Sequence, residues 1–216
     1  MRQRLLLAAA LMLLPIPNLY ADTVWFNLEG GFDTSYMQKT AGTNTMWDPG
    51  TYTVDGSALN NHALWETGGD ATGDGAFGLF NGRDDLADSL VWGRTVTVGT
   101  SDVFSLFAKN LCCTDRSGRQ GPDLQVWLNN TKACDIATDG PGVWELFSCS
   151  LLGYSGATRI EVRNGVTVFD GNDFGLDGPA VPTPEPASLL LLGSGLLYAG
   201  RRSFRQHRRK GASCVS

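Results

Sequence analysis

Short runs of apolar residues, separated by clusters of Gly, Asn and Asp, extend along residues 22–180. At 95–98 and 159–163, apolar and polar residues alternate with a period of two, which is typical of a strand with one buried face. No 11-residue window of this region has the apolar stripe of an amphipathic helix. The pattern predicts ten strands, at 23–28, 51–54, 63–66, 76–80, 90–98, 103–109, 124–128, 144–151, 158–163 and 166–169. Strands of this length with Gly-rich turns predict an all-β protein, with a single jelly-roll-type β-sandwich over residues 22–180.

The start of the chain has a different pattern. Arg2 and Arg4 precede an uncharged apolar run at 5–14, and Ala21 closes the segment. A positive start, a short apolar run and a small final residue are the three parts of a secretory signal peptide. The ten apolar residues at 5–14 are too few to cross a bilayer core about 30 Å thick. We therefore expect residues 1–21 to form a signal helix that is removed on export.

The end of the chain has three further segments. A Pro-rich spacer at 181–186 is followed by an apolar segment at 187–200 and a tail at 201–216 with six Lys or Arg residues and no Asp or Glu. An apolar helix followed by positive residues is typical of a membrane span whose positive end stays in the cytoplasm. Fourteen residues of helix are only about 21 Å long. We therefore expect a transmembrane helix that is held in the membrane transiently.

The order of motifs in these segments is specific. Pro184-Glu185-Pro186 precedes the Leu- and Gly-rich span, and Arg201 and Arg202 follow it directly. This combination resembles the PEP-CTERM sorting tail, which is also called an ice-binding protein C-terminal domain. The resemblance implies recognition in the inner membrane by an exosortase-type sorting enzyme and cleavage near the Pro-Glu-Pro motif. It also implies delivery to the cell surface or extracellular matrix of a Gram-negative bacterium.

Short motifs also occur in order along the body, at 30–33 (Gly-Gly-Phe-Asp), 73–79, 123–129 and 172–177 (Asn-Asp-Phe-Gly-Leu-Asp). In this order they resemble the galactose-binding-like jelly rolls, which include many carbohydrate-binding modules. Gly178-Pro179 replaces the polar residue and final strand that usually follow the last motif. We therefore expect the closing strand to be shortened.

The charge is unevenly distributed, which excludes one class of partner. The formal net charge of the chain is −5, whereas residues 22–180 carry 21 acidic and 9 basic side chains, a net charge of −12. An acidic body repels the phosphates of nucleic acids. We therefore expect no nucleic acid among its partners.

The body contains an even number of cysteines, as expected for a protein of an oxidising compartment. They are Cys112, Cys113, Cys134 and Cys149. A disulfide between the adjacent Cys112 and Cys113 would close a strained ring, so each is expected to pair with Cys134 or Cys149. A metal site is the alternative, although no histidine lies near and the spacing is not that of a zinc site.

Acidic residues at the two ends of the body suggest a calcium site. Calcium binds several oxygen ligands, and adjacent first and last strands would bring Asp33 close to Asp173 or Asp177. A structural Ca²⁺ is the one cofactor that the sequence suggests. The alternative is that Asp173 and Asp177 are ordinary residues of turns and strand ends.

Aromatic residues are the candidates for ligand binding. Trp47, Tyr52 and Trp65 lie near predicted loops, where an exposed ring can stack on the face of a sugar. Packing in the core is the alternative for each of them. Trp92, Trp127 and Trp144 lie in strand-like runs and are expected to be buried or half-buried.

Three hypotheses for the function follow. The leading one is a noncatalytic exported protein of the cell surface or matrix that binds extracellular polysaccharide. The second is a structural or adhesive module that binds another protein. The third is a secreted enzyme acting on glycosides, with Glu66, Asp84 and Asp85 as candidate carboxylates. Against an enzyme, no Gly-x-Ser-x-Gly motif surrounds a serine, and His62 is the one histidine of the body.

Overall fold

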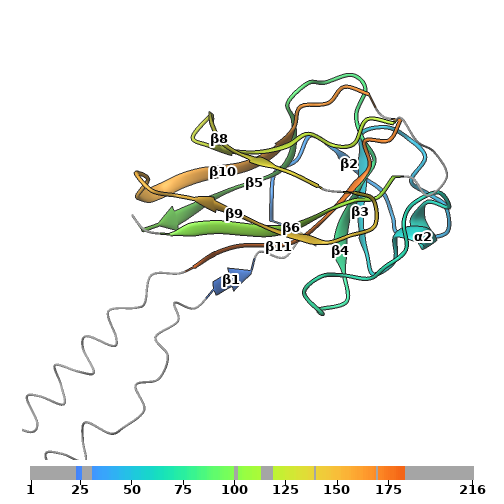
Figure 1. The fold of residues 1–216 in the computed structure, drawn as a ribbon, viewed down its shortest axis with the longest axis horizontal. Coiled ribbons are helices and arrows are strands. Elements are labelled where there is room, and N and C mark those ends of the chain that lie inside the picture. The colour runs from blue at the N-terminus through green and yellow to red at the C-terminus, as the bar shows by residue number, and fades with distance from the viewer. Residues whose placement is uncertain are drawn as a thin grey trace, which may run out of the picture. The chain divides into compact units, whose positions relative to one another are not determined.

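A computed structural model of the chain describes residues 23–25, 31–99, 102–112, 119–138, 140–168 and 170–182. These residues belong to one compact unit, Thr23–Thr183 (Figure 1). The predicted signal helix at 1–21, the Pro-Glu-Pro motif, the apolar segment at 187–200 and the basic tail at 201–216 lie outside the described residues. Among the described residues, no helix is both long and apolar enough to cross a membrane.

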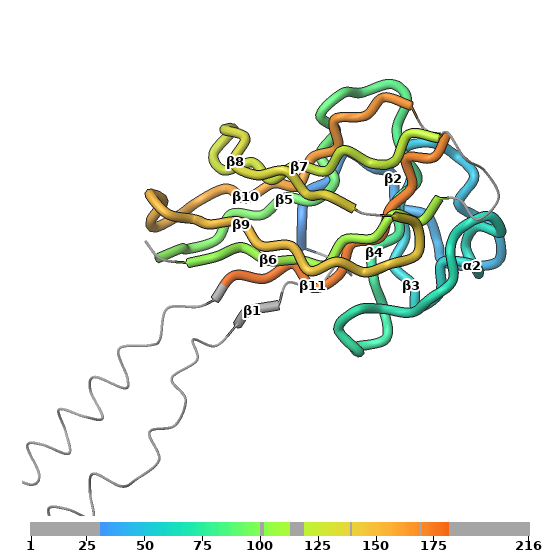
Figure 2. Tube along the Cα trace, viewed as in Figure 1, coloured from blue at the N-terminus to red at the C-terminus, as the bar shows by residue number. Residues whose placement is uncertain are grey.

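The strands form two sheets that pack face to face (Figure 2). The larger sheet has the order β2–β3–β4–β11–β6–β9, with β1 also paired to β11. Its strands are β1 (Thr23–Trp25), β2 (Met37–Gln38), β3 (Thr51–Asp55), β4 (Phe77–Phe80), β6 (Val103–Asn110), β9 (Glu145–Ser150) and β11 (Phe174–Pro182). The smaller sheet has the order β5–β10–β7–β8, formed by β5 (Ser89–Val98), β7 (Leu124–Leu128), β8 (Thr131–Ile136) and β10 (Gly156–Asn164). The predicted all-β sandwich is confirmed.

The main core lies between the two sheets. Because side chains alternate between the two faces of a strand, Ile160 and Val162 of β10 point into this core and are fully buried. Val126 and Leu128 of β7 join them, as the period-two pattern predicts. Trp92 of the smaller sheet stacks on Phe104 of the larger one, with ring centroids 5.7 Å apart.

The last strand, β11, lies in the middle of the larger sheet. It pairs with β6 on one side and with β4 and then β1 on the other. The strand continues through Gly178-Pro179 because the register shifts between Asp177 and Ala180, and Gly178 adopts a positive φ of 50°. Bulges are among the few places where a sheet accommodates proline. The expectation of a shortened closing strand is therefore wrong.

A second apolar cluster covers the outer face of the larger sheet. It consists of buried Met46, Ala58, Trp65, Phe77, Leu79 and Leu111, against which Trp144 packs. The segment that supplies Met46 and Trp65 contains α2 (Ala58–Asn61), a single helical turn. Ser57 caps this turn by accepting a hydrogen bond from the backbone N–H of Asn60 at 3.3 Å. The sequence pattern does not predict α2, because four residues are too few to show a helical period.

Some elements differ from the prediction. Residues 63–66, and the described residues of 166–169, are not in strands, whereas β2, β8 and β11 are not among the ten predicted strands. Strand β8 is an edge strand with mostly exposed side chains, so it has no clear apolar alternation. It follows a tight turn in which Asn129 and Asn130 have φ values of 47° and 65°. Asparagine tolerates this backbone conformation, which two-residue hairpin turns require.

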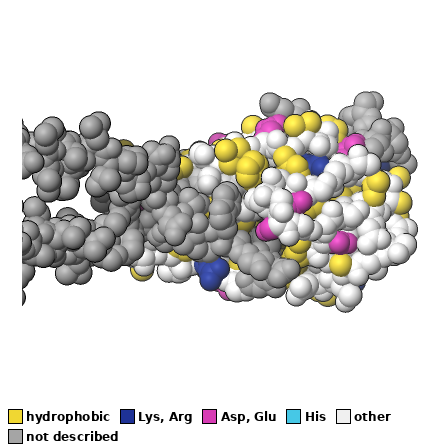
Figure 3. Space-filling model, turned by 90° about the horizontal axis from the view of Figure 1, so that it is seen from below, with side chains coloured by type: hydrophobic (Ala, Val, Ile, Leu, Met, Phe, Trp, Pro, Cys, Tyr) yellow, Lys and Arg dark blue, Asp and Glu magenta, His cyan; other side chains and the backbone are white. Residues whose placement is uncertain are grey.

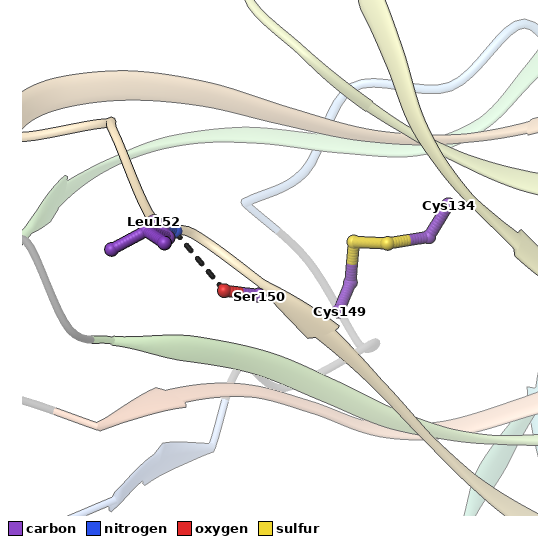
Figure 4. Close-up of a disulfide and its surroundings, with 4 residues drawn as sticks. All are labelled: Cys134, Cys149, Ser150 and Leu152. Atoms are coloured by element: carbon purple, nitrogen blue, oxygen red, sulfur yellow. Dashed lines mark hydrogen bonds between the residues drawn. A yellow bond between two sulfur atoms is a disulfide. The ribbon is translucent and has the colours of Figure 1, made fainter.

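A disulfide joins the edge strands of the two sheets. It links Cys134 of β8 to Cys149 of β9 and so closes the sandwich along one side (Figure 4). Cys112 is also disulfide-bonded. Cys113 lies outside the described residues. The expected pairing of Cys112 and Cys113 with Cys134 or Cys149 is wrong, because Cys134 and Cys149 bond to each other.

Replacing both Cys134 and Cys149 by Ala should lower the stability of the domain. The bond spans 15 residues of sequence, and a loop of this size contributes about 3 kcal/mol in the chain-entropy model. For a domain of this size, that corresponds to a fall in melting temperature of roughly 6–12 °C. Calorimetry should detect this fall, whereas the exposed pair Thr131→Ala and Ser148→Ala on the same two strands should leave the melting temperature within about 2 °C of the wild type. Equal melting temperatures for both double variants would contradict the role of the disulfide.

Candidate functional site

The three aromatic candidates have different environments. The ring of Trp47 is half-exposed, with 50% of its surface accessible. Trp65 is fully buried in the second apolar cluster, and Tyr52 is buried in the main core, stacked on Phe80 with centroids 5.5 Å apart. Trp65 and Tyr52 cannot stack on an external sugar, so these two predictions are wrong. Trp47 is the candidate that remains.

Trp47 is held from its inner side by two further rings. His62, the residue directly after α2, lies 4.0 Å from the Trp47 ring centroid to centroid, at an interplanar angle of 42°. Trp65 stacks on the other side of His62, at 5.0 Å and 19°. Burial and the nearby Arg119 lower the pKa of His62. The imidazole is therefore neutral at neutral pH and packs as an uncharged ring against the two indoles.

The backbone around Trp47 is fixed by hydrogen bonds to the helical segment. The Met46 N–H donates to the Asn61 carbonyl at 3.0 Å, and the Ala63 N–H donates to the side-chain oxygen of Asn44 at 3.1 Å. The buried Met46 side chain anchors the loop one residue before Trp47. The exposed indole is therefore held by packing and hydrogen bonds, which reduces the entropy that a ligand must remove.

An open groove of about 480 Å³ lies beside β2 and β3. It is lined by Gln38, Lys39, Thr40, Ala41, Thr53 and Val54. Lys39 connects the groove to the aromatic stack, because its ammonium group pairs at 2.8 Å with Asp48, the residue after Trp47. The groove offers amide, hydroxyl and charged groups within the same part of the larger sheet as the exposed ring. In Figure 1 this part, with β2, β3 and α2, lies at the end of the sandwich away from β1.

A buried carboxylate lies behind the aromatic stack. Asp173, directly before β11, accepts a hydrogen bond from the Gly82 N–H at 3.2 Å. Burial raises its pKa to about 6, while Trp65, Gly82 and Arg119 act in the opposite direction. The Trp65 indole N–H lies near this carboxylate without reaching hydrogen-bond geometry. Asp173 thus lies close to the base of the stack.

The three carboxylates predicted to bind calcium do not form a common site. Asp33 pairs with Arg159 at 2.6 Å on the smaller sheet. Asp177 instead accepts hydrogen bonds from the backbone N–H groups of Ala71 and Thr72, at 2.6 and 3.0 Å. Within the part of the chain that the structure describes, no three acidic, histidine or cysteine side chains are grouped to hold a metal ion. These residues therefore do not fit the predicted calcium site.

The single histidine of the body and two of the candidate carboxylates have partners within the domain. His62 is stacked between two indoles, and its Nδ1 accepts a hydrogen bond from the Leu64 N–H at 3.3 Å. Asp85 pairs with Arg83 at 2.8 Å on the exposed surface. Glu66 lies close enough to Lys109 to raise the lysine pKa, although burial lowers it more strongly. The structure thus uses these groups for packing and for ion pairs.

Sequence reasoning missed a polar network on the outer face of the smaller sheet. Glu161 accepts hydrogen bonds from Arg159 at 3.1 Å and from Arg163 at 2.8 Å. The Arg163 guanidinium lies over the Trp127 ring, 4.4 Å from its centroid. The alternation of Arg159, Glu161 and Arg163 along one strand is the signal that could have predicted it. Because these groups satisfy one another, we interpret the network as a brace for the sheet.

Asp173→Asn should remove a pH-dependent loss of stability. The folded-state pKa of about 6 lies above the ordinary value of 3.8. The protonated form is therefore favoured in the folded state, and stability is lost as pH rises from about 4 to about 6. A shift of about two units corresponds to roughly 3 kcal/mol, and a neutral Asn can still accept the Gly82 N–H.

Urea unfolding at pH 4 and pH 7 checks this prediction. The free energy of unfolding of the Asp173→Asn variant should exceed that of the wild type at pH 7 and differ little from it at pH 4. Replacing the exposed Asp84 by Asn is the matched control and should have little effect at either pH. A variant that is less stable than the wild type at pH 7 would show that the charged form is the favoured one.

The fold is similar to several solved structures. Tandem CBM51 modules of the family 98 glycoside hydrolase Sp3GH98 from Streptococcus pneumoniae match with 9% identity and a TM-score of 0.49, over 76% of this chain and 49% of theirs. A Stig cyclase from Fischerella sp. matches with 11% identity and a TM-score of 0.45, over 77% and 90%. The CBM22-1 xylan-binding domain of Xyn10C from Paenibacillus barcinonensis matches with 16% identity and a TM-score of 0.36, over 65% and 87%. These matches include both binding modules and an enzyme, and the likeness is one of general architecture.

The C-terminal segment has a more specific match. No curated protein is significantly similar in sequence to the chain. Residues 182–206, however, match the PEP-CTERM protein-sorting motif, which confirms the sorting tail that the sequence predicts. The chain is therefore an exported protein that carries a PEP-CTERM sorting motif behind a β-sandwich domain.

Proposed function

We propose that this protein is a noncatalytic protein of the surface or extracellular matrix of a Gram-negative bacterium, where it binds extracellular polysaccharide. The observation that carries the proposal is the half-exposed ring of Trp47, held against His62 beside an open polar groove. The binding surface consists of the Trp47 ring and the groove residues Gln38, Lys39 and Thr40.

The chemistry of this surface suits a sugar. The apolar faces of sugar rings stack on aromatic side chains, whereas their hydroxyl groups need donors and acceptors at the rim. Trp47 supplies the aromatic face and is backed by His62 and Trp65, so it can receive a ring without rearranging. Lys39 and the exposed Gln38 and Thr40 of the groove supply polar groups.

The face seen in Figure 3 also favours a polar ligand over a large protein partner. On the face seen in Figure 3, hydrophobic side chains are scattered among polar and charged ones. Stable protein interfaces are usually built around a contiguous apolar core. The groove beside β2 and β3, in contrast, is open and is lined mainly by polar residues. The sorting motif also supports a location outside the cell, where extracellular polysaccharide is found.

Trp47→Ala should weaken binding of the exported protein to polysaccharide by tenfold or more. Central aromatic residues of a binding site commonly contribute on the order of 2 kcal/mol, and about 1.4 kcal/mol is a tenfold change in affinity. Affinity electrophoresis through gels that contain the polysaccharide of the producing bacterium measures the change.

Two variants serve as controls for this experiment. Leu146→Ala removes an exposed apolar side chain from β9, and Trp127→Ala removes the ring of the braced network on the smaller sheet. Neither should change binding. Loss of binding in Trp127→Ala with Trp47→Ala unaffected would move the site to the smaller sheet, and no retardation of the wild type by any polysaccharide would contradict the proposal.

Glu185→Ala should leave the sorting tail on the protein. The proposal requires an exosortase-type enzyme to recognise the Pro184-Glu185-Pro186 motif and to cleave near it, after removal of the signal peptide. Intact-mass measurement of protein from the native host should give a wild-type chain that begins near Asp22 and ends near Pro186. The Glu185→Ala chain should retain Arg201 and the residues beyond it in the membrane fraction. Recovery of a full-length wild-type chain would contradict processing.

A further inference from the structure

One end of the sandwich, which we call the anchor end, is where the chain both enters and leaves the domain. Thr23, the first residue of β1, pairs directly with Pro182, the last residue of β11. Next to them, β6 begins at Val103, which pairs with Ser150 at the end of β9. Because Ala180 pairs with Ser105, the same register brings Pro182 level with Val103 and Ser150. In Figure 1, these strand ends lie opposite α2.

Apolar side chains are exposed at the anchor end. Leu152 has 77% of its surface accessible, the largest exposure among the large apolar side chains of the described residues, and Val103 has 38%. Leu152 sits in the turn that follows β9, beyond the Cys149 disulfide (Figure 4). The turn is ordered by two hydrogen bonds, from the Leu152 N–H to Ser150 Oγ at 3.2 Å and from the Tyr154 N–H to the Leu151 carbonyl at 3.0 Å.

The length of the chain that follows limits how far this end can lie from a membrane. Five residue steps separate Pro182 from Ala187, where the apolar segment of the sorting tail begins. Fully extended, they reach at most about 18 Å. Strands β9 and β11 run in the same direction, since both are antiparallel to β6. Leu152, two residues beyond Ser150, therefore reaches up to about 7 Å further than Pro182 in the direction in which β11 leaves the domain.

We infer that the anchor end contacts the lipid bilayer through Leu152 and Val103 while the sorting tail is in the membrane. This inference rests on the membrane-bound stage of the proposed function. The two side chains alone form a small apolar surface, but the short tether gives them a high local concentration at the bilayer. The contact holds the domain upright, with the Trp47 end directed away from the membrane.

Charge decides which lipids suit this contact. The body has a net charge of −12, and anionic headgroups would repel it. At the anchor end, the Asp102 carboxylate is used within the turn, where it accepts the Gly99 N–H at 2.6 Å. The partner that fits is therefore the headgroup region of a zwitterionic bilayer. Apolar side chains enter this region without electrostatic repulsion.

The test uses the full chain, tail included, in nanodiscs of phosphatidylcholine with a gadolinium-carrying lipid. The methyl groups of leucine and valine are isotope-labelled, and the loss of their NMR signals reports proximity to the bilayer surface. Leu152 and Val103 should lose at least half of their signal intensity. Leu59 on α2, opposite the anchor end, is the internal control and should lose almost no signal. The sandwich separates it from the bilayer, because β5 alone, with ten residues, is about 33 Å long.

A variant separates contact from mere proximity. Leu152→Glu places a charge at the tip of an exposed turn, where it is not expected to disturb the fold, and should reduce the signal loss of Val103 at least twofold. Signal loss that is equal at Leu152 and Leu59, or absent at Leu152 in chains that enter the discs, would overturn the inference and leave polysaccharide binding untouched. Failure of the full chain to enter the discs would overturn the membrane-bound stage as well. Signal loss at Leu152 that requires added sorting enzyme would assign the tip to that protein instead of to lipid.

Discussion

The position of β11 in the middle of the larger sheet is the constraint on which the rest of the domain depends. This strand is the last part of the body to be synthesised, yet it supplies the hydrogen bonds of β6 on one side and of β4 and β1 on the other. Phe174, Leu176 and Val181 fill the main core, so the two sheets cannot pack fully without them. The domain can therefore be completed only after the chain has been made and exported to Pro182, two residues before the Pro-Glu-Pro motif. A cut at or after Pro184 leaves this strand whole, and a cut only a few residues earlier would remove part of the core.

The same strand connects the two ends of the molecule. Asp173, directly before β11, lies near Trp65 at the base of the aromatic stack, and Pro182 ends the strand beside Thr23 at the anchor end. Midway, Asp177 accepts two backbone N–H groups of the segment at 71–72 and so ties the second apolar cluster's covering loops to the central strand. Burial raises the pKa of Asp177, while these two hydrogen bonds lower it, which is how a carboxylate can be retained at a buried position. Asp173 and Asp177, two of the three predicted calcium ligands, thus serve to attach loops to β11.

The sequence predicts most of the long strands well. The elements that it misses are missed for physical reasons. Strands that bury one face, such as β5 and β10, show period-two alternation and are found close to the predicted bounds. Strand β8 has few buried side chains, and α2 is one turn long, so neither has a pattern to read. Strand β11 was expected to be cut short at Gly178-Pro179. This expectation failed because the bulge that accommodates the proline depends on the register with β6, which the sequence does not show. The cysteine pairing failed for the same kind of reason: Cys134 and Cys149 meet only because β8 and β9 are the edges of different sheets, which is a property of topology.

The candidate site was predictable in its chemistry and only in part in its residues. Trp47, Tyr52 and Trp65 all lie near loops in the sequence, but the second apolar cluster on the outer face of the larger sheet buries Trp65. Covering this face with the segment that contains α2 removes one indole from solvent and uses it, through His62, to hold another at the surface. A loop tryptophan without such backing would lose conformational freedom on binding, whereas Trp47 has already lost most of it on folding. The exposure of one ring and the burial of the other are therefore parts of one arrangement, and a single sequence position cannot reveal which role it has.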